Sequence, residues 1–245
     1  MKRKLIVLMG LDGSGKSTQA EMASEWLRSR GIPTEVVWMR GESYITQPVL
    51  SIGKALLRAP RQEKRGGGIE SGKDYERYVD GKQAMFKNRF LRAIWRTLTI
   101  IDLYITFKLS FRSVGRDTRV VILDRYVYDS LIDIDSAFGS GGTEAVRMLD
   151  SSLLGLFPEP DMVFLLEIPP EEAMKRKDDI PSIVYLEERH DLYLKFAEIT
   201  GAIRLDSTAS KEQVQTRIRN RLKEENDLRM EKSLKEDSDL REEAE

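Results

Sequence analysis

A glycine-rich turn between an apolar run and a helical pattern restricts the fold of this chain more than any other segment. Residues 10–18 read GLDGSGKST and match the pattern G-x-x-x-x-G-K-[ST]. The apolar run Lys4–Met9 precedes them, and a helical pattern over Ser17–Arg30 follows. In a strand–turn–helix of this kind, backbone N–H groups and the helix N-terminus surround an anion. Motif and context together predict a phosphate-binding loop rather than a chance glycine-rich turn.

The side chains of this loop suit a nucleoside triphosphate. We expect Lys16 to face solvent and to neutralise β- and γ-phosphate oxygens, and the Ser17 hydroxyl to ligate Mg²⁺. The residues expected to bind ATP are Gly10, Gly13, Ser14, Gly15, Lys16, Ser17 and Thr18. ATP and Mg²⁺ are therefore the expected cofactors.

Short runs of Val, Ile and Leu indicate strands buried on both faces of a sheet, because the runs are nearly continuous rather than alternating. They are Lys4–Met9, Pro33–Met39, Thr118–Leu123, Met162–Ile168 and Ala202–Leu205. Helical patterns cover Ser17–Arg30, Gly81–Phe111, Thr143–Leu156, Pro170–Lys177, Tyr185–Thr200 and Lys211–Leu222. Strands that alternate with helices form parallel sheets. The predicted fold is an α/β P-loop NTPase, a five-stranded parallel sheet flanked by helices, with a short lid.

A second polar motif, Asp124 followed by Arg125 and Tyr126, closes the third strand. An Asp at the carboxyl end of a strand next to the first would face the bound nucleotide and hold Mg²⁺ through a water. Arg125 would lie beside the transferring phosphoryl group, which a guanidinium can bind with two hydrogen bonds. A strand-end salt bridge is the alternative, and the phosphate loop nearby argues for the metal site.

The composition removes several kinds of catalysis. The chain of 245 residues has no cysteine and one histidine, His190, which lies in a polar helical pattern and is expected at the surface. Disulfides, thiolate nucleophiles and cysteine-based metal sites are thereby excluded, and a His-centred triad is disfavoured. The net charge of −1 provides no overall field that would attract nucleic acid or a membrane.

The order of these motifs resembles the thymidylate kinase family. The matching segments are GLDGSGKST, an Arg after the second strand, DRY at 124–126, PEPD at 158–161, PPEEAMKRK at 169–177 and IRLDST at 203–208. The resemblance runs from Lys4 to Leu222. It implies an enzyme that transfers the γ-phosphoryl group of ATP to a nucleoside monophosphate, with dTMP as the expected acceptor.

The resemblance also assigns roles by position. The implied catalytic residues are Asp12, Lys16, Arg125 and Arg176; the acceptor-binding residues are Asp12, Arg40, Arg125 and Tyr126; the metal ligands are Ser17 and Asp124. Asp12 would contact the sugar hydroxyl or the phosphate end of the acceptor, Arg40 would hold its phosphate, and Arg125 would bridge the two substrates. Arg176, with Lys175 or Lys177, would be the cation of a lid at residues 174–184.

Departures from the family pattern leave two other functions open. LMG at 8–10 stands where the family has Phe-Glu-Gly, RGE at 40–42 where it has Arg-Glu-Pro-Gly-Gly, and IDLY at 101–104 where it has an Asp-Arg pair. These segments bear on the acceptor rather than on phosphate binding. A diverged kinase of another small anionic acceptor therefore stays open. So does a nucleotide-dependent switch or ATPase, although the Asn-Lys-x-Asp segment of a GTPase is absent.

The segment Lys82–Arg119 is locally basic. Arg89, Arg92 and Arg96 share one face of the predicted helix. This face is either simply solvated, or it covers the acceptor pocket and presents Arg to an anionic substrate.

Residues 1–222 are expected to form one kinase domain, and residues 223–245 a charged tail that is solvated or binds a partner. The apolar run near the N-terminus is too short for a signal peptide, and Leu98–Phe111 is too short to span a bilayer. We therefore expect a cytoplasmic protein that binds nucleotide substrates but neither nucleic acid nor membranes. A homodimer is implied by the resemblance alone.

Overall fold

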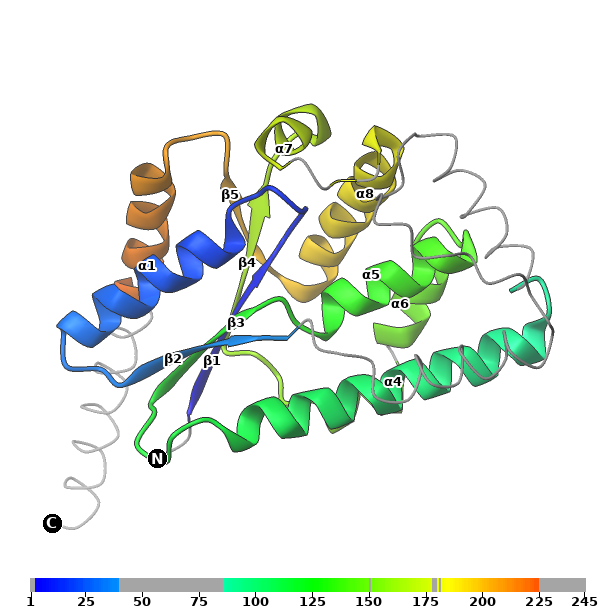
Figure 1. Ribbon diagram of the computed structural model, residues 1–245, viewed down its shortest axis with the longest axis horizontal. Coiled ribbons are helices and arrows are strands. Elements are labelled where there is room, and N and C mark those ends of the chain that lie inside the picture. Colours follow the sequence, from blue (N-terminus) through cyan, green and yellow to red (C-terminus); the bar gives the residue numbers. More distant parts are fainter. Residues whose placement is uncertain (1–2, 40–85, 150, 178–179, 181, 225–245) are drawn as a thin grey trace, which may run out of the picture.

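The computed structural model describes residues 3–39, 86–149, 151–177, 180 and 182–224 of the chain. Its centre is a five-stranded parallel sheet with helices on both faces, as the sequence predicts (Figure 1). The strands are β1 (Lys4–Met9), β2 (Thr34–Trp38), β3 (Val120–Asp124), β4 (Met162–Glu167) and β5 (Ile203–Asp206). All of them lie close to the predicted runs.

The strand order β2-β3-β1-β4-β5 places β1 at the centre of the sheet. The chain leaves β1 toward β2 on one side, returns to β3 beside β1, and then crosses to β4 on the other side. Ligands of open α/β sheets bind at the carboxyl ends of strands where the order reverses in this way. The register pairs Leu8 with Asp124. The loop after β1 and the polar end of β3 therefore lie side by side.

Each face of the sheet has its own helices, because successive side chains of a strand point to opposite faces. The helix α1 (Lys16–Ser29) and the helix of residues 211–224 pack on one face, and α4 (Arg89–Arg112), α5 (Val127–Phe138) and α8 (Ile183–Thr200) on the other (Figure 1). The buried strand residues divide accordingly, with Ile6, Leu8, Ile122 and Phe164 on the first face and Val7, Met9, Val121 and Leu123 on the second. None of the described helices is long and apolar enough to cross a membrane.

The helix α5 is not predicted by the sequence analysis. Asp129, Asp133 and Asp135 lie within it, and Asp is a poor helix former. In the structure these carboxylates have partners that a single sequence does not reveal. Asp129 caps the first turn of α5, and Asp135 accepts three backbone N–H bonds at the start of α6 (Thr143–Leu149). Tertiary contacts therefore override the local propensity.

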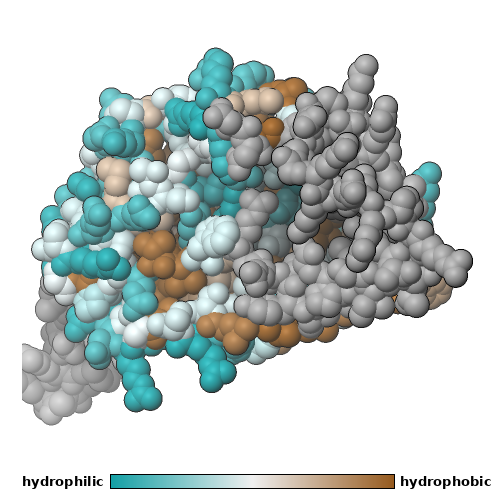
Figure 2. Space-filling view, in the orientation of Figure 1, coloured by the Kyte–Doolittle hydropathy of each residue, from teal (hydrophilic) through white to brown (hydrophobic). Residues whose placement is uncertain are grey.

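The predicted helix Gly81–Phe111 corresponds to α4 in the described part of the chain. The helix begins after Asn88, whose side chain accepts hydrogen bonds from two backbone N–H groups of the first turn at 2.9 and 3.3 Å. Residues 81–85 lie outside the described residues. Part of the apolar surface of α4 is exposed, including Phe90 (74%) and Ile94 (57%), and Figure 2 shows hydrophobic side chains along this edge.

The predicted helix Thr143–Leu156 is divided in two. It consists of α6 and the short 3₁₀ helix η1 (Ser152–Leu156). Between them Ser151 donates a side-chain hydrogen bond of 2.7 Å to the carbonyl of Met148. Serine side chains compete in this way with helical backbone bonds. The helix α7 (Pro170–Arg176) opens with proline, as predicted.

Candidate active site

The loop after β1 presents backbone N–H groups because glycine permits its path. Gly10 and Gly13 have φ values of 143° and 88°, and a Cβ atom on them would lie 2.6 Å from the carbonyl oxygen of Leu166 and 2.5 Å from that of Ala173. No side chain among the described residues caps α1, and its first turn holds no acidic residue. The free N–H groups at this helix N-terminus therefore favour an anion.

Lys16 does not face solvent as expected. Its side chain is 5% exposed, and its amine donates hydrogen bonds of 2.8 and 2.6 Å to the carbonyl oxygens of Gly10 and Leu11. Burial, followed by the charge of Arg125, lowers the pKa of Lys16 to about 8. The amine is thus held inside the curve of the loop, where a phosphate oxygen would replace backbone carbonyls as its partner.

The pair predicted to ligate the metal lies together. Asp124, at the end of β3, is buried, and one of its carboxylate oxygens accepts a hydrogen bond from the Ser17 hydroxyl. The other oxygen, Oδ1, is buried without a hydrogen-bond partner in the described structure. A carboxylate oxygen and a hydroxyl are the hard ligands that Mg²⁺ prefers. The two residues therefore fit a magnesium ion.

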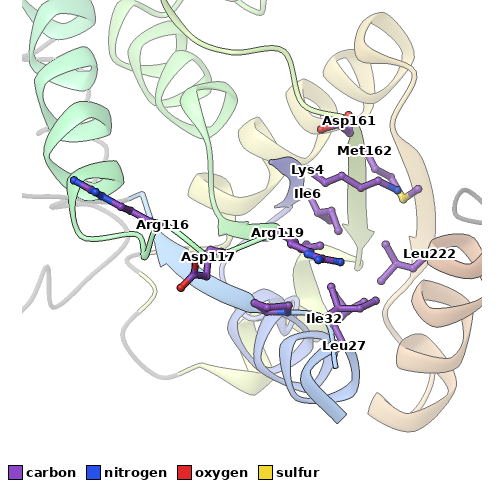
Figure 3. Close-up of a pocket in the computed structure, with 13 residues that line it drawn as sticks. Lys4, Ile6, Leu27, Ile32, Arg116, Asp117, Arg119, Asp161, Met162 and Leu222 are labelled. Atoms are coloured by element: carbon purple, nitrogen blue, oxygen red, sulfur yellow. The ribbon is translucent and has the colours of Figure 1, made fainter. Parts of the chain in front are cut away.

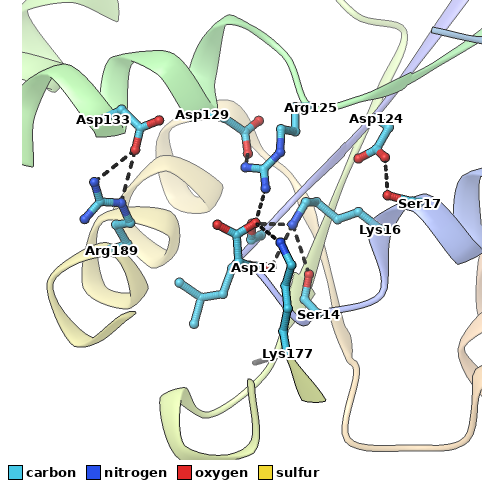
Figure 4. A network of polar contacts seen from close by, with 12 residues as sticks. Asp12, Ser14, Lys16, Ser17, Asp124, Arg125, Asp129, Asp133, Lys177 and Arg189 are labelled. Atoms are coloured by element: carbon cyan, nitrogen blue, oxygen red, sulfur yellow. Dashed lines mark hydrogen bonds and ion pairs between the residues drawn. The ribbon is translucent and has the colours of Figure 1, made fainter. Parts of the chain in front are cut away.

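Arg125 turns the chain from β3 into α5 with a backbone φ of 74°, the only positive φ of a non-glycine residue in the described part of the chain. Its guanidinium forms an ion pair with Asp12 and lies 3.5 Å from the carboxylate of Asp129 (Figure 4). Burial alone would lower the pKa of Arg125, but the nearby carboxylates outweigh it and raise the pKa. Arg125 therefore presents a permanent positive charge beside the phosphate loop.

The sequence analysis missed the contact between Arg125 and Asp129, whose carboxylate is itself held by other groups. The carboxylate of Asp129 accepts hydrogen bonds from the Tyr193 hydroxyl at 2.6 Å and from the backbone N–H of Tyr126 at 3.0 Å. Burial raises the pKa of Asp129, and burial together with the Asp129 charge raises the pKa of Tyr193 well above its ordinary value. Arg125 lies before the first turn of α5 with a positive φ, so the i,i+4 spacing of a helix does not apply to it, and no signal in the sequence pointed to this contact.

A second missed group extends from Asp12 along α8. The Tyr185 hydroxyl lies 3.4 Å from a carboxylate oxygen of Asp12, and the Arg189 guanidinium lies 3.7 Å from the centre of the Tyr185 ring. Arg189 in turn binds Asp133 of α5 through two nitrogens, at 3.1 and 3.0 Å (Figure 4). Charged and aromatic side chains therefore line the contact between α5 and α8.

The cations of the expected lid differ in direction. Arg176 donates a 2.9 Å hydrogen bond to the carbonyl of Ser207, and the amine of Lys177 lies 4.0 Å from Asp12. Lys175 instead pairs with Glu172 on the exposed side of α7. Arg176 and Lys177 thus face the site, whereas Lys175 does not. Residues 178, 179 and 181 of the expected lid lie outside the described residues.

Two cavities meet at the phosphate loop. The first, of about 430 Å³, is lined by Asp12, Gly13, Gly15, Lys16, Ser17, Thr18, Trp38, Asp124, Arg125, Arg176 and Lys177. The second, of about 450 Å³, is lined by Gly13, Ser14, Gly15, Thr18, Gln19, Arg176, Ser207, Thr208, Ala209, Ser210, Lys211 and Val214. Arg176 lines both. The sequence analysis used the IRLDST segment only for the family resemblance and gave it no site role. The lining residues that it did not expect are Gln19, Trp38, Ser207, Thr208, Ala209, Ser210, Lys211 and Val214.

Other expected residues lie elsewhere. Tyr126 is buried, and its hydroxyl donates to the Pro158 carbonyl at 2.6 Å, so it supports the site from the core instead of lining either cavity. Arg40 lies outside the described residues. On α4, Arg96 pairs with Glu144 and Arg92 lies over the ring of Phe138. These arginines attach α4 to its neighbours and line neither cavity.

Comparison with known proteins agrees with the sequence resemblance. The model of the thymidylate kinase family matches residues 109–218. The chain is 30% identical over 219 residues to a probable thymidylate kinase of Thermococcus kodakarensis, covering 86% of this chain and 91% of the relative. It is 28% identical over 222 residues to a probable thymidylate kinase of Methanosphaera stadtmanae (89% and 96% covered), and 27% identical over 228 residues to a thymidylate kinase of Leptospira interrogans (87% and 92%).

Proposed function

This chain belongs to the thymidylate kinase family, and we propose that it transfers the γ-phosphoryl group of ATP to thymidine monophosphate, giving ADP and thymidine diphosphate. The observation that carries the proposal is the pair of cavities that share the phosphate loop and Arg176. Two nucleotides bound in them would meet at their phosphate ends. Phosphoryl transfer requires such positioning together with charge neutralisation, and little covalent chemistry from the protein.

The donor belongs in the cavity beside Ser207–Lys211. The adenosine would lie against this segment, and the phosphates would bind under the loop, at the free N–H groups of α1. Lys16 would then exchange its bonds to the carbonyls of Gly10 and Leu11 for β- and γ-phosphate oxygens. The exchange keeps its charge partnered in a buried place.

The acceptor belongs in the cavity beside Asp12 and Arg125. Its phosphate oxygen would attack the γ-phosphorus as the bond to the β,γ-bridging oxygen breaks. Arg125 would hold the acceptor phosphate, and Arg176 and Lys177 would approach the equatorial oxygens from the lid. Asp12 would contact the acceptor sugar, and Arg40 remains our candidate for a second contact to its phosphate.

Ser17 and Asp124, which both line the first of the two cavities, would hold Mg²⁺. The bound ion would neutralise charge on the phosphates during transfer. The buried and unpartnered Asp124 Oδ1 supports this assignment.

The proposal is tested with purified protein, ATP and Mg²⁺ against a panel of nucleoside monophosphates, with ADP formation as the readout. We expect turnover with thymidine monophosphate above the others. Lys16→Ala should abolish it, and Lys175→Ala, on the outer side of α7, should not. Turnover only with a different small anion would favour a diverged kinase. Slow acceptor-independent hydrolysis would favour a switch or ATPase.

We further propose that the protein is a cytoplasmic homodimer that binds no nucleic acid. The exposed apolar row on α4 supports the dimer, because a helix of this length seldom leaves such a face in water. The row consists of Phe90, Leu91, Ile94, Ile101 and Leu109.

A further inference from the structure

A third cavity, of about 510 Å³, lies at the opposite end of the sheet from the phosphate loop (Figure 3). It is lined by Lys4, Ile6, Leu27, Ile32, Pro33, Arg116, Asp117, Thr118, Arg119, Val120, Asp161, Met162 and Leu222. These residues come from the amino ends of β1, β3 and β4 and from the last turns of two helices. The volume falls within the range of about 300–1,000 Å³ that is usual for small-molecule sites.

The floor of this cavity consists of apolar side chains at the edge of the core, on the α1 face of the sheet. Leu27 on α1 and Leu222 on the helix of residues 211–224 belong to the same buried cluster as Ile6. In the described part of the chain α1 ends at Ser29 and the other helix at residue 224, and Ile32 and Met162 are only partly buried. Apolar surface left accessible in a concave place is stabilised when an apolar body fills it.

The rim of the cavity carries a positively charged side chain, Arg119. The Arg119 side chain is exposed and takes part in no hydrogen bond or ion pair within the described structure. Figure 3 shows its guanidinium directed across the cavity between Ile6 and Leu27, whereas Arg116 is directed away.

The acidic groups nearby are placed differently. Asp161 uses one carboxylate oxygen to accept a 2.8 Å hydrogen bond from the backbone N–H of Leu5, and Asp117 is exposed at the margin. Lys4 also lines the cavity, but it has an interaction partner within the protein, so Arg119 is the charged group left for an occupant over the apolar floor.

We propose that this cavity is a second ligand site, for a small organic anion whose carboxylate, sulfonate or phosphate pairs with Arg119 and whose apolar body rests on Ile6, Leu27 and Met162. A guanidinium suits such an occupant because it binds oxyanions with two hydrogen bonds and stacks on flat apolar groups. The site is separate from nucleotide binding, since β1 and β3 carry the phosphate loop and Asp124 at their other ends.

The test is a fluorescence titration of the full-length chain with anilinonaphthalene sulfonate, an aromatic sulfonate that brightens in apolar surroundings. We expect saturable binding at one site, unchanged when ATP and Mg²⁺ are present. Arg119→Glu should weaken binding about tenfold or more. Ile32→Trp, which places a larger side chain at the floor, should weaken it similarly. Melting curves of both variants check that each is folded.

The matched control is Arg112→Glu, which makes the same charge change at the exposed end of α4, outside the cavity. Its affinity for the probe should equal that of the unmodified chain. Three results would overturn the proposal: no saturable binding, displacement of the probe by ATP, or equal weakening by Arg112→Glu and Arg119→Glu. The test does not depend on the kinase activity, so the two proposals can fail separately.

Discussion

The hydroxyl of Tyr193 on α8 donates a 2.6 Å hydrogen bond to Asp129 on α5, and the oxygen that accepts it is the one that lies 3.5 Å from Arg125. The helix α8 therefore fixes the carboxylate that lies against the guanidinium of Arg125, the residue proposed to hold the acceptor phosphate. The contact leads from α8 to the centre of the proposed reaction.

Tyr193→Phe removes this hydrogen bond and keeps the ring. We expect kcat to fall about tenfold, about 1.4 kcal/mol, while the KM for ATP changes little, because Arg125 is proposed to hold the acceptor phosphate and not ATP. Tyr128→Phe is the control, since Tyr128 is a partly buried tyrosine of α5 that lies outside this network. Steady-state kinetics of both variants measure kcat and the KM for ATP. Equal kcat values for Tyr193→Phe and the unmodified chain would show that Asp129 holds Arg125 unaided.

Asp124→Asn weakens the proposed magnesium site. The Mg²⁺ concentration for half-maximal rate should rise about tenfold or more, because a charged ligand becomes neutral. The free energy of unfolding should not fall much, because a neutral amide costs less to bury than the carboxylate, which offsets a weaker hydrogen bond with Ser17. The control is Asp117→Asn on the surface. An unchanged Mg²⁺ requirement would remove Asp124 from the metal site.

Arg176→Ala and Lys175→Ala compare two neighbouring cations of α7. Arg176 lines both nucleotide cavities, whereas Lys175 pairs with Glu172 on the outside. We expect kcat to fall about 10²–10³-fold in the first variant and to stay unchanged in the second. Rapid-quench measurement of ADP formation separates transfer from product release. Comparable losses in both variants would point to a general charge effect of α7.

Glu35→Gln tests a carboxylate away from the site. Glu35 accepts hydrogen bonds from the Thr118 hydroxyl at 2.5 Å and from the backbone N–H of Gly115 at 2.9 Å, and the first of these is the main reason that its pKa is lowered from 4.5. A lowered folded-state pKa stabilises the fold above pH 4.5, and this contribution disappears as the pH falls through the folded value.

The two proteins should therefore differ in free energy of unfolding at neutral pH and converge as the pH falls through the lowered pKa of Glu35. Urea unfolding over a series of pH values from neutral to acid measures this. A difference that persists in acid would assign the effect of Glu35 to packing.

Ile94→Glu tests the α4 face as the dimer contact. A two-fold interface places the substituted residue near its own symmetry-related surface, so the change acts on both subunits. We expect light scattering to report monomers. Ala93→Glu, at an exposed neighbouring position, should leave the mass unchanged. A mass that is the same for both variants would move the contact away from Ile94.

The sequence alone predicted the part of this molecule whose signals are local. Lys4–Met9 is a strand with the bounds expected, and the loop after it, Ser17 and Asp124 come together because parallel strands end at one edge. Backbone geometry and strand order determine those positions. A single sequence contains that information directly.

The features it did not predict depend on contacts between distant segments. The three Asp residues lower the helix propensity of α5, so this helix is not recognised until their partners are known. The burial of Lys16 depends on its hydrogen bonds to the carbonyl groups of Gly10 and Leu11. Tyr126 was expected to bind the acceptor because the family resemblance implied it for the DRY segment. Its side chain points into the core instead, since Arg125 has a positive φ and turns the chain between them.

Gly13 of the phosphate loop lies against the backbone of Ala173 in α7. A methyl group there would lie 2.5 Å from the carbonyl oxygen of Ala173 in α7, and the three nearest atoms that it would meet all belong to Ala173. An alanine at this position would act as a wedge, and the structure could relieve the overlap by moving α7 outward. Arg176, three residues along the same helix, would then be withdrawn from both cavities. Gly13 thereby determines how closely α7 can approach the phosphate loop, and the position of Arg176 relative to both cavities depends on an atom that glycine lacks.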